Sequence, residues 1–392
     1  METFVSSWFE AFPRRKKFTG IEAMEGPYFF IIPSIASIPV NPLLLFLLLI
    51  GAVISSPIAL AEHPKKLIFA VDLIRHGDRT PIIEIPKAPH HWPEGLGQLT
   101  PLGMHQEYNL GEKFHHRYID QEKLLSRVYQ PGTLYVRSTD VDRTLMSAEC
   151  VLMGLYPPGT GPFLHPAFLM NWFALPYGFQ PIPIHTAPQD HDALLIPRHS
   201  TEEIKQSIEA IPECQEKEKE LQPHFAAWSE ATGLSIHDLL DVERLGDALH
   251  IYQLKHIAMP KGLSNADVNT ILKADEIIFK QSIASVQGSG ENLLSEISHR
   301  LEQAAEKKYS LKYALYSAHD ANIMSLLTTM GASIKEIPHY ASDLNIALYE
   351  KENHHFEVQI TLNDHPVQLK GRMSGTCSLQ QFLALASTSK SL

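Results

Sequence analysis

Hydrophobic and polar positions alternate in a strand–helix–strand–helix order from Lys66 to about Pro158. The mostly apolar run Leu67–Ile74 predicts a strand that is buried on both faces. Thr100 followed by Pro101 predicts a helix start, because Thr is a favoured N-cap and Pro fits the first helical position. The predicted strands are 67–74 and 133–136, and the predicted helices are 100–118 and 142–155. This alternation indicates right-handed βαβ units and a largely parallel sheet.

The middle of the chain, from about Thr201 to Gln303, has a different pattern. Glu, Lys, Gln, Leu and Ala are frequent there and strand signals are few, which favours helices. The predicted helices are 201–211, 216–231, 235–249, 265–286 and 290–307. Strand signals return at 312–316, 344–349 and 356–361, before a final predicted helix at 378–386. We therefore predict an α/β fold with a mainly parallel sheet, a core of residues 62–175 and 305–392, and a mainly α-helical cap insertion of residues 176–304.

Residues 1–61 have the pattern of a secretory signal peptide. The uninterrupted apolar run Leu43–Ile54 is followed by Ala59-Leu60-Ala61, a small-residue pattern typical of a cleavage site. The basic cluster Arg14–Lys17 lies unusually far upstream, so a translation start nearer the run, for example at Met24, is one alternative. An uncleaved membrane anchor is another, because the run approaches the ~20 residues that span a bilayer. We expect cleavage and export, with a secreted, periplasmic or lumenal location.

Composition and charge exclude some classes of partner. Of the 392 residues, 44% are hydrophobic and 20% are charged, which is typical of a globular protein. The net charge is −11, and residues 1–61 contribute nothing to it because their four acidic and four basic side chains cancel. This acidity argues against nucleic acid or an anionic membrane as a partner. A membrane association is expected only if the N-terminal segment is uncleaved.

Three cysteines allow at most one disulfide and leave one thiol over. Cys150 lies among apolar residues and is predicted to be a buried free thiol. Cys214 with Cys377 is the better candidate for a disulfide, which export would permit. No Cys or His spacing resembles a zinc site, so we predict neither a metal nor a cofactor.

The candidate chemistry begins at Arg75-His76-Gly77-Asp78-Arg79, directly after the first predicted strand. The two guanidinium groups offer forked donors that match phosphate oxygens, and they stay charged. Gly77 allows the backbone to approach a ligand closely. Nearby positive charge also favours the neutral, nucleophilic form of His76. A surface turn with mixed-charge ion pairs has the same residue types, so the assignment depends on the segments that accompany this one.

Two further charged segments also follow predicted strands. Arg137-Ser138-Thr139-Asp140 follows the second strand, and Ser317-Ala318-His319-Asp320 follows the strand at 312–316. Ligands of open parallel sheets bind beyond the carboxyl ends of the strands, so we expect the three segments to converge. The dipeptide His-Asp occurs three times, but only His319-Asp320 follows a buried-strand pattern. Together the segments supply guanidinium groups, imidazoles and a carboxylate suited to phosphoryl transfer through a phosphohistidine.

This combination resembles the histidine acid phosphatase family, the exported branch of the histidine phosphatase superfamily. The likeness covers most of residues 66–390 and includes the stretch 92–104 (WPEGLGQLTPLGM), the run 136–148 (VRSTDVDRTLMSA) and the segment Tyr316-Ser317-Ala318-His319-Asp320. The resemblance implies an α/β sandwich with an α-helical cap. It also implies a phosphomonoesterase that needs no metal and works best at acidic pH. Asp343 stands where vertebrate relatives have Cys, so their disulfides and dimer contacts are not transferred.

The resemblance also implies roles for residues at matching positions. His76 is expected to be the nucleophile that becomes phosphorylated, and Asp320 the proton donor to the departing alcohol. The residues expected to bind the phosphoryl oxygens are Arg75, Arg79, Arg137 and His319.

Four neighbouring residues are given positioning or structural roles. Asp78 and Asp140 are interpreted as residues that orient arginine or loop backbone rather than as catalytic carboxylates. Asp142 and Arg143 are interpreted as a structural pair at the start of a helix.

Other functions compete with the phosphatase hypothesis. A mutase-like transferase shares the phosphohistidine, but the export signal and the His319-Asp320 pair weigh against it. A non-catalytic phosphate-binding or adhesion module predicts the loss of His76 or Asp320, and both are present. A phytase-like specificity stays open within the hydrolase class. The expected partners are small phosphate monoesters, with phosphotyrosine peptides and a homodimer left open.

Overall fold

The computed structural model describes residues 65–164, 172–196, 201–285, 289–333, 336–369 and 375–389, all within the structural unit Glu62–Leu392. The predicted signal segment and its cleavage site lie outside the described residues. Every predicted strand is present, with ends that differ by a residue or two. The strands are β1 (Lys66–Arg75), β2 (Leu134–Ser138), β3 (Tyr313–Ala318), β4 (Asp343–Glu350), β5 (Phe356–Leu362), β6 (His365–Pro366) and β7 (Thr376–Ser378).

Most helices follow the sequence pattern, but the single helix predicted at 216–231 is two helices that begin at Pro212 and Phe225, and the helix Asp320–Thr329 was not predicted. Thr100 caps the helix that begins at Pro101, and its side chain accepts a hydrogen bond from the Gly103 amide. The helices are α2 (Pro101–Phe114), α3 (Asp142–Leu155), α4 (Thr201–Glu209), α5 (Pro212–Leu221), α6 (Phe225–Thr232), α7 (Leu239–Leu254), α8 (Asn265–Ser285), α9 (Ser289–Ala305), α10 (Asp320–Thr329) and α11 (Leu379–Ser389). A π-helical segment, His115–Gln121, continues α2 where the sequence predicted more α-helix. Short 3-10 turns lie at Pro176–Gly178, Gln189–His191, Gln222–His224 and Glu352–His354.

The sheet is mixed rather than mainly parallel. The strand order is β2-β3-β1-β4-β5-β6, with β7 also paired to β5. Only β2, β3 and β1 run parallel, and β4 to β7 add antiparallel pairs. The cause is connection length: few residues separate β4, β5 and β6, and such short loops form hairpins, whereas a parallel pair needs a long crossover. The α/β class is confirmed, while its parallel part is smaller than predicted.

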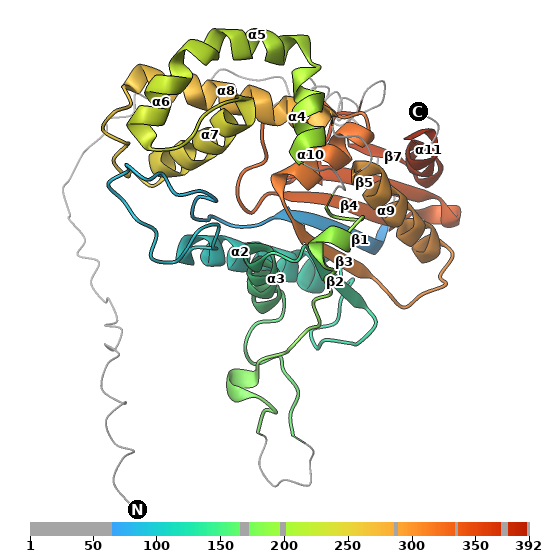
Figure 1. The fold of residues 1–392 in the computed structure, drawn as a ribbon. Helices are drawn as coiled ribbons and strands as arrows, with labels where there is room; N and C mark the ends of the chain where they lie inside the picture. The colour runs from blue at the N-terminus through green and yellow to red at the C-terminus, as the bar shows by residue number, and fades with distance from the viewer. Residues whose placement is uncertain are drawn as a thin grey trace, which may run out of the picture. The chain divides into compact units, whose positions relative to one another are not determined.

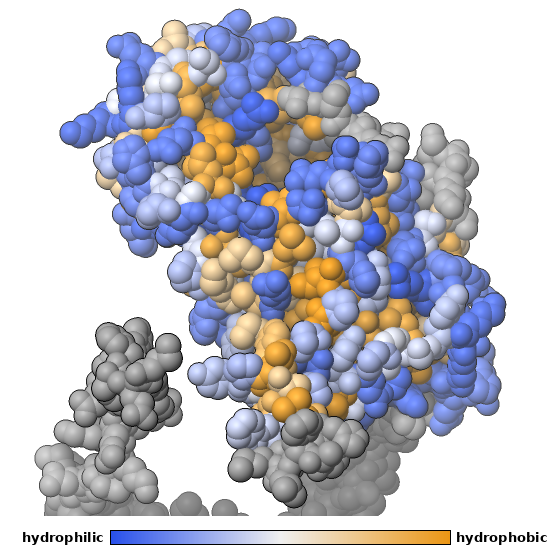
Figure 2. Space-filling model, turned by 60° about the horizontal axis from the view of Figure 1, so that its bottom comes forward, coloured by the Kyte–Doolittle hydropathy of each residue, from blue (hydrophilic) through white to orange (hydrophobic). Residues whose placement is uncertain are grey.

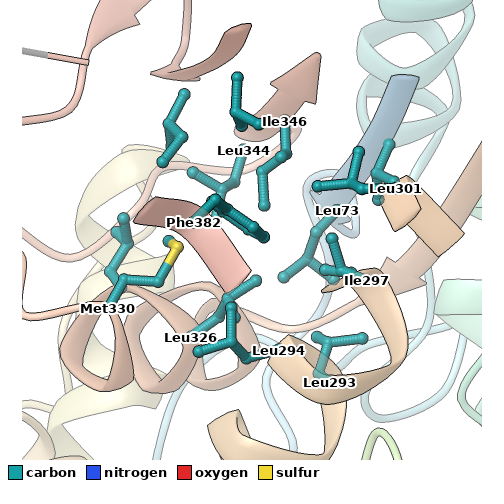
Figure 3. Close-up of a cluster of buried hydrophobic side chains, with 14 of the residues drawn as sticks. Leu73, Leu293, Leu294, Ile297, Leu301, Leu326, Met330, Leu344, Ile346 and Phe382 are labelled. Atoms are coloured by element: carbon teal, nitrogen blue, oxygen red, sulfur yellow. The ribbon is translucent and has the colours of Figure 1, made fainter. Parts of the chain in front are cut away.

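Helices cover both faces of this sheet, as Figure 1 shows. Helices α2 and α3 lie on one face, where Phe114 and Val151 pack with Ile74 of β1. Helices α9, α10 and α11 lie on the other face, where they bury Leu73. Apolar side chains of this second layer interdigitate in Figure 3, with Leu294 and Leu301 of α9, Leu326 of α10 and Phe382 of α11 gathered around strand residues. This two-sided burial explains the nearly continuous apolar run in β1.

A separate hydrophobic cluster joins helices α4 to α8. Trp228 of α6, Leu245 and Leu249 of α7 and Ile271 of α8 are almost completely buried in it. These helices form their own group beside the sheet in Figure 1. Helix α9 falls within residues 176–304 but packs on the sheet, so the helical group itself ends with α8. The division into core and cap stays a prediction.

Aromatic side chains are exposed in the segment between α3 and the helical group, and this segment is largely uncharged. No Asp, Glu, Lys or Arg occurs from residue 150 to residue 189. Trp172 is 63% exposed and Tyr177 is 88% exposed, and Phe163 stacks on Phe173 with ring centroids 4.5 Å apart. Hydrophobic side chains are visible on the face that Figure 2 draws, surrounded by hydrophilic ones.

No helix among the described residues is both long enough and apolar enough to cross a membrane.

The predicted disulfide is wrong. Cys214 is a buried free thiol in the cluster of α4 to α8, whereas Cys377 of β7 packs against the sheet. The two side chains therefore belong to different hydrophobic clusters. Cys150 is free as predicted, although it is only half-buried, and burial raises the pKa of its thiol to about 11.

Candidate active site

The carboxyl ends of the three parallel strands meet at one edge of the sheet. Arg75 at the end of β1 is in register with Ala318 of β3, and Ser138 of β2 is in register with Ser317. The charged segments that follow these strands therefore lie side by side, as ligand-binding segments do in other sheets of this kind. The predicted convergence is confirmed.

The turn that carries His76 is clamped from two sides. The His76 amide donates to the Ala318 carbonyl oxygen (3.1 Å), and the His76 carbonyl oxygen accepts from the Ala341 amide (3.2 Å). On the other side, a Cβ added to Gly77 would lie 2.5 Å from the carbonyl oxygen of Gly103 in α2. Glycine is therefore required at 77 by the contact with α2. The nucleophile candidate sits on a backbone that cannot shift easily.

The imidazole of His76 is held in one tautomer. Its Nδ1 lies 2.8 Å from the Gly77 carbonyl oxygen, which only accepts hydrogen bonds, so Nδ1 carries the proton and Nε2 keeps its lone pair. Burial, followed by the charge of His319 and of three arginines, lowers the pKa of His76 well below its usual value. His76 thus remains neutral in mildly acidic solution, with Nε2 available as a nucleophile.

Arg75 and Arg79 flank this imidazole and each holds a carboxylate. Arg75 Nη2 lies 2.7 Å from Asp320 Oδ2. Arg79 makes a two-pronged pair with Asp247 of α7, with distances of 3.1 and 2.7 Å. Burial would lower the pKa of Arg79, but Asp247 outweighs it and the pKa is raised. The Nε atoms of both arginines are buried and have no hydrogen-bond partner among the described residues.

Arg143 is a third guanidinium of the site, and sequence reasoning missed it. It lies in the first turn of α3, and its Nη2 is 3.5 Å from His319 Nδ1. Burial and the charge of Arg79 lower the pKa of Arg143 to about 10, which leaves it cationic below that pH. The predicted pair with Asp142 is wrong, because Asp142 accepts instead from Gln98 Nε2 (3.3 Å). A cation in the first turn of a helix is unfavourable because it opposes the helix dipole. This placement is the one sequence signal that could have identified Arg143 as a site residue.

Arg137 is the predicted site residue that the structure does not bring to His76. Its Nη2 pairs with the buried Asp192 at 2.7 Å. Side chains alternate along a strand, so Arg137 shares a face of β2 with Tyr135, which packs on the side of α9. Arg143 joins the cluster in its place, six residues later along the chain.

His319 precedes α10 and bridges two segments of the site. Its Nε2 lies 3.1 Å from Thr139 Oγ1, and its ring centroid is 5.4 Å from that of His76. Burial and the charge of Arg143 outweigh the attraction of Asp320 and lower the pKa of His319 to about 3. With Arg143 donating to Nδ1, the neutral ring carries its proton on Nε2. The imidazole is therefore a neutral donor group rather than a cation.

Asp320 begins α10 and faces the same space. Its Oδ1 accepts from the Ala321 amide (2.8 Å), and its Oδ2 is held by Arg75. Burial would raise the pKa of Asp320, but the charges of Arg75 and Arg79, the neighbouring His319 and the amide hydrogen bond outweigh it and lower the pKa. Asp320 is therefore ionised in the site as described.

Helix α7 supports the turn from the helical group. Besides the Asp247–Arg79 pair, Lys255 at the end of α7 contacts the buried carboxylate of Asp78. Asp78 also accepts from the Thr100 hydroxyl, so it ties the turn to the start of α2. Asp78 fits the predicted positioning role, whereas Asp140 is exposed and only its carbonyl oxygen is contacted, by Gln189. No motif in the sequence pointed to Asp247 or Lys255.

Taken together, the cluster can hold a tetrahedral dianion beside a neutral nucleophile. The Nε–H groups of Arg75, Arg79 and Arg143 are buried donors without partners in the described chain, as is that of Arg137, which lies outside the cluster. Buried donors of this kind are rare unless a ligand satisfies them. No group of three or more His, Cys, Asp or Glu side chains in the described residues is arranged to hold a metal ion.

Comparisons with known proteins show the family of the chain. Residues 66–229 and 237–363 match the histidine phosphatase superfamily (branch 2). The chain is 31% identical over 341 residues to human prostatic acid phosphatase, covering 82% of this chain and 85% of that protein. It is 32% identical over 340 residues to bovine lysosomal acid phosphatase, covering 82% and 77%.

Solved structures show the same fold at lower identity. The phytase of Citrobacter braakii superposes with a TM-score of 0.58 at 16% identity, covering 83% of this chain and 98% of that one. A phytase of Klebsiella sp. ASR1 also superposes with a TM-score of 0.58, at 15% identity, covering 83% and 96%. The family match over most of the chain carries the assignment: the protein belongs to branch 2 of the histidine phosphatase superfamily and is a phosphomonoesterase of that family.

Proposed function

We propose that the protein is an exported acid phosphatase that hydrolyses phosphate monoesters through a phosphohistidine at His76, without a metal ion. The observation that carries the proposal is the single tautomer of His76, with its free Nε2 beside three buried guanidinium groups. The apolar run Leu43–Ile54 and the Ala59-Leu60-Ala61 pattern support export.

In the first step, His76 Nε2 attacks phosphorus and the P–O ester bond breaks. The electron pair of that bond leaves with the ester oxygen, which takes a proton from Asp320. A phosphoryl transition state spreads negative charge over its equatorial oxygens, so fixed cations stabilise it strongly. Arg75, Arg79 and Arg143 are the cations in reach. The neutral His319 can add its single N–H, at Nε2, once that group exchanges Thr139 Oγ1 for a phosphoryl oxygen.

In the second step, water attacks the phosphohistidine on phosphorus. Asp320, now a carboxylate, takes a proton from the water while the P–N bond breaks and Nε2 regains its lone pair. Inorganic phosphate leaves, and the proton taken from water leaves Asp320 in its acid form for the next cycle. A positioned acid or base typically contributes about 10²–10⁴-fold to such a step.

The acidic optimum follows from two opposite protonation requirements. His76 must be neutral, and its lowered pKa keeps it so as the pH falls. Asp320 must be protonated when the ester bond breaks, which low pH favours. Substrates with small alcohols or phenols fit this scheme, and the mutase alternative is distinguished by its product, a new phosphate ester instead of inorganic phosphate.

The test is to trap the intermediate. Enzyme is mixed with ³²P-labelled phosphate monoester at pH 5 with EDTA present, and the reaction is quenched in alkali, where phosphohistidine survives. We expect labelled protein and released phosphate with the wild type, and neither with His76→Ala. His105→Ala, which removes an exposed histidine of α2, is the matched control and should behave as the wild type. Full turnover by His76→Ala, or loss of turnover with EDTA, would contradict the proposal.

A further inference from the structure

Tyr340 lies against the two residues at the centre of the site. The Arg75 guanidinium carbon sits 4.4 Å from the Tyr340 ring centroid, a cation–π arrangement. The same ring is 5.8 Å from the His76 ring, centroid to centroid, and is tilted by 39° to it. Tyr340 is half-buried in the segment that leads into β4. Its ring therefore packs beside both His76 and Arg75.

The backbone holds Tyr340 in this place at a cost in strain. Ala341, the next residue, has a φ of 56°, in the left-handed region that a side chain disfavours. Its amide donates to the His76 carbonyl oxygen, and the Ser342 carbonyl oxygen accepts from the Arg75 amide (2.9 Å). Strain of this kind persists where surrounding contacts enforce it, and it concentrates at functional sites. Here the enforcing contacts are made by the catalytic turn itself.

The phenol hydroxyl of Tyr340 makes no hydrogen bond to another described residue, and the phenol lies within electrostatic reach of Arg79 and Arg75. Burial raises the pKa of Tyr340 and the charges of Arg79 and Arg75 oppose this, so the hydroxyl is electrostatically coupled to both. The net result is a raised pKa, which keeps the phenol protonated across the acidic and neutral range. A neutral donor near three cations and a nucleophile is positioned for an anionic ligand.

We propose that Tyr340 is a substrate-binding residue, whose hydroxyl donates a hydrogen bond to the phosphoryl group while its ring orients the Arg75 guanidinium. This inference rests on the proposed phosphatase activity. The ring function matters because Arg75 must exchange Asp320 for the phosphoryl oxygens when substrate binds. A guanidinium stacked on an aromatic face can turn in its plane without losing that contact.

Two substitutions separate the hydroxyl from the ring. Tyr340→Phe removes only the hydroxyl, and Tyr340→Leu removes the ring as well. The readouts are kcat/KM for p-nitrophenyl phosphate at pH 5 and the inhibition constant of inorganic phosphate, which binds without any chemistry. We expect Tyr340→Phe to lower kcat/KM and to raise the inhibition constant of phosphate, each by about 10- to 100-fold, as for the loss of a hydrogen bond to a charged group. Tyr340→Leu should weaken phosphate binding further, because Arg75 also loses its support.

The control is Tyr309→Phe, which removes the hydroxyl of an exposed tyrosine just before β3, at the end of the strand opposite the site. It should match the wild type in both readouts, and melting temperatures should stay within about 2 °C for all variants with an aromatic ring at 340. Unchanged kcat/KM and phosphate inhibition in Tyr340→Phe would overturn the inference. A wild-type enzyme without any turnover would instead refute the proposed function, so the two failures are distinguishable.

Discussion

Arg75 Nη2 and Asp320 Oδ2 lie 2.7 Å apart, although the proposed reaction needs each of them for a different task. Arg75 has to hold phosphoryl oxygens, and Asp320 has to carry a proton to the ester oxygen. The pairing lowers the pKa of Asp320, which opposes the acid role. A bound dianion resolves the conflict, because it draws Arg75 away and places negative charge beside the carboxyl group. Both changes raise the pKa of Asp320.

The first prediction is that dianion binding takes up one proton. Sulfate is the probe, because it stays dianionic from pH 4 to pH 8 and does not titrate itself. Between the pKa of Asp320 in the free enzyme and its higher pKa in the complex, the affinity for sulfate should rise about tenfold for each unit by which the pH is lowered. Calorimetry in buffers of different ionisation enthalpy measures both the affinity and the proton. In Asp320→Asn the proton uptake should disappear, and persistence of the same pH dependence would assign the proton to a histidine instead.

A second prediction concerns the leaving group. Asp320→Asn should slow hydrolysis of an alkyl phosphate such as glycerol 2-phosphate by about 10²–10⁴-fold. It should slow p-nitrophenyl phosphate less in the first step, because nitrophenolate leaves without a proton. Single-turnover measurement of phosphoenzyme formation isolates that step from the later attack by water. Equal losses for the two substrates would show that Asp320 does not protonate the leaving oxygen.

The third prediction separates the two arginines of the 136–148 run. Arg143→Ala should lower kcat/KM by about 10²–10³-fold, as for the loss of one charge-stabilising donor. Arg137→Ala should keep most of the turnover but lower the melting temperature, because the buried Asp192 carboxylate loses its cationic partner and keeps only backbone amide donors. The pair of variants is measured for kcat/KM and thermal unfolding. Loss of turnover in Arg137→Ala at an unchanged melting temperature would reverse the assignment.

These residues also mark how far the sequence could predict the site. His76, Arg75 and Asp320 follow buried strands, and local apolar runs identify such strands well. The helix Asp142–Leu155 was predicted with its observed bounds, because polar residues and prolines delimit it. The direction of the Arg143 side chain depends on how α3 is placed against β3, which is a tertiary property. The local sequence pattern therefore placed Arg143 at the start of a helix but did not predict its contact with His319.

Contacts between distant segments were equally out of reach. Asp247 meets Arg79 across 168 positions of sequence, and no periodicity in α7 distinguishes it from other surface carboxylates. The mixed sheet could not be predicted for the same reason, because strand direction depends on contacts between separate segments. Strand patterns predicted β4 and β5, but the direction of a strand is decided by its connection and by its neighbours rather than by its residues.

The last prediction concerns stability and follows from carboxyl groups beneath the site. Asp275 of α8 packs closely against Gly246 of α7, where an added Cβ would lie 2.4 Å from the Asp275 Cβ. Burial, with the charges of Glu243, Asp247 and Asp320, raises the pKa of Asp275 from 3.8 to about 9. Burial and Asp247 likewise raise the pKa of Glu243 to about 7. The folded protein thus keeps protons that the unfolded chain releases.

The sign of the pH dependence follows from this difference. Between about pH 4 and pH 9 the unfolded chain binds fewer protons at these carboxyls, so the free energy of unfolding falls as the pH rises. The lowered pKa values of His76 and His319 act in the opposite direction, but only below about pH 6.5, where unfolded histidines become protonated. Above that pH the carboxyls act alone among these groups. Stability should therefore be greatest in mildly acidic solution and decline towards pH 9.

Thermal unfolding from pH 6 to pH 9 tests this directly. We expect the wild-type melting temperature to fall by several degrees over that range, and Asp275→Asn to lose about 2–4 °C less, because an amide has no proton to release. Glu220→Gln is the matched control: it changes an exposed carboxylate of α5 that is paired with Lys217 and is not among the charges that raise the pKa of Asp275, so it should keep the wild-type slope. If Asp275→Asn and the wild type decline in parallel, the proton at Asp275 does not contribute to stability. A smaller fall in the melting temperature of Asp275→Asn would show that the proton held by Asp275 stabilises the fold in acidic solution, where the proposed reaction is also fastest.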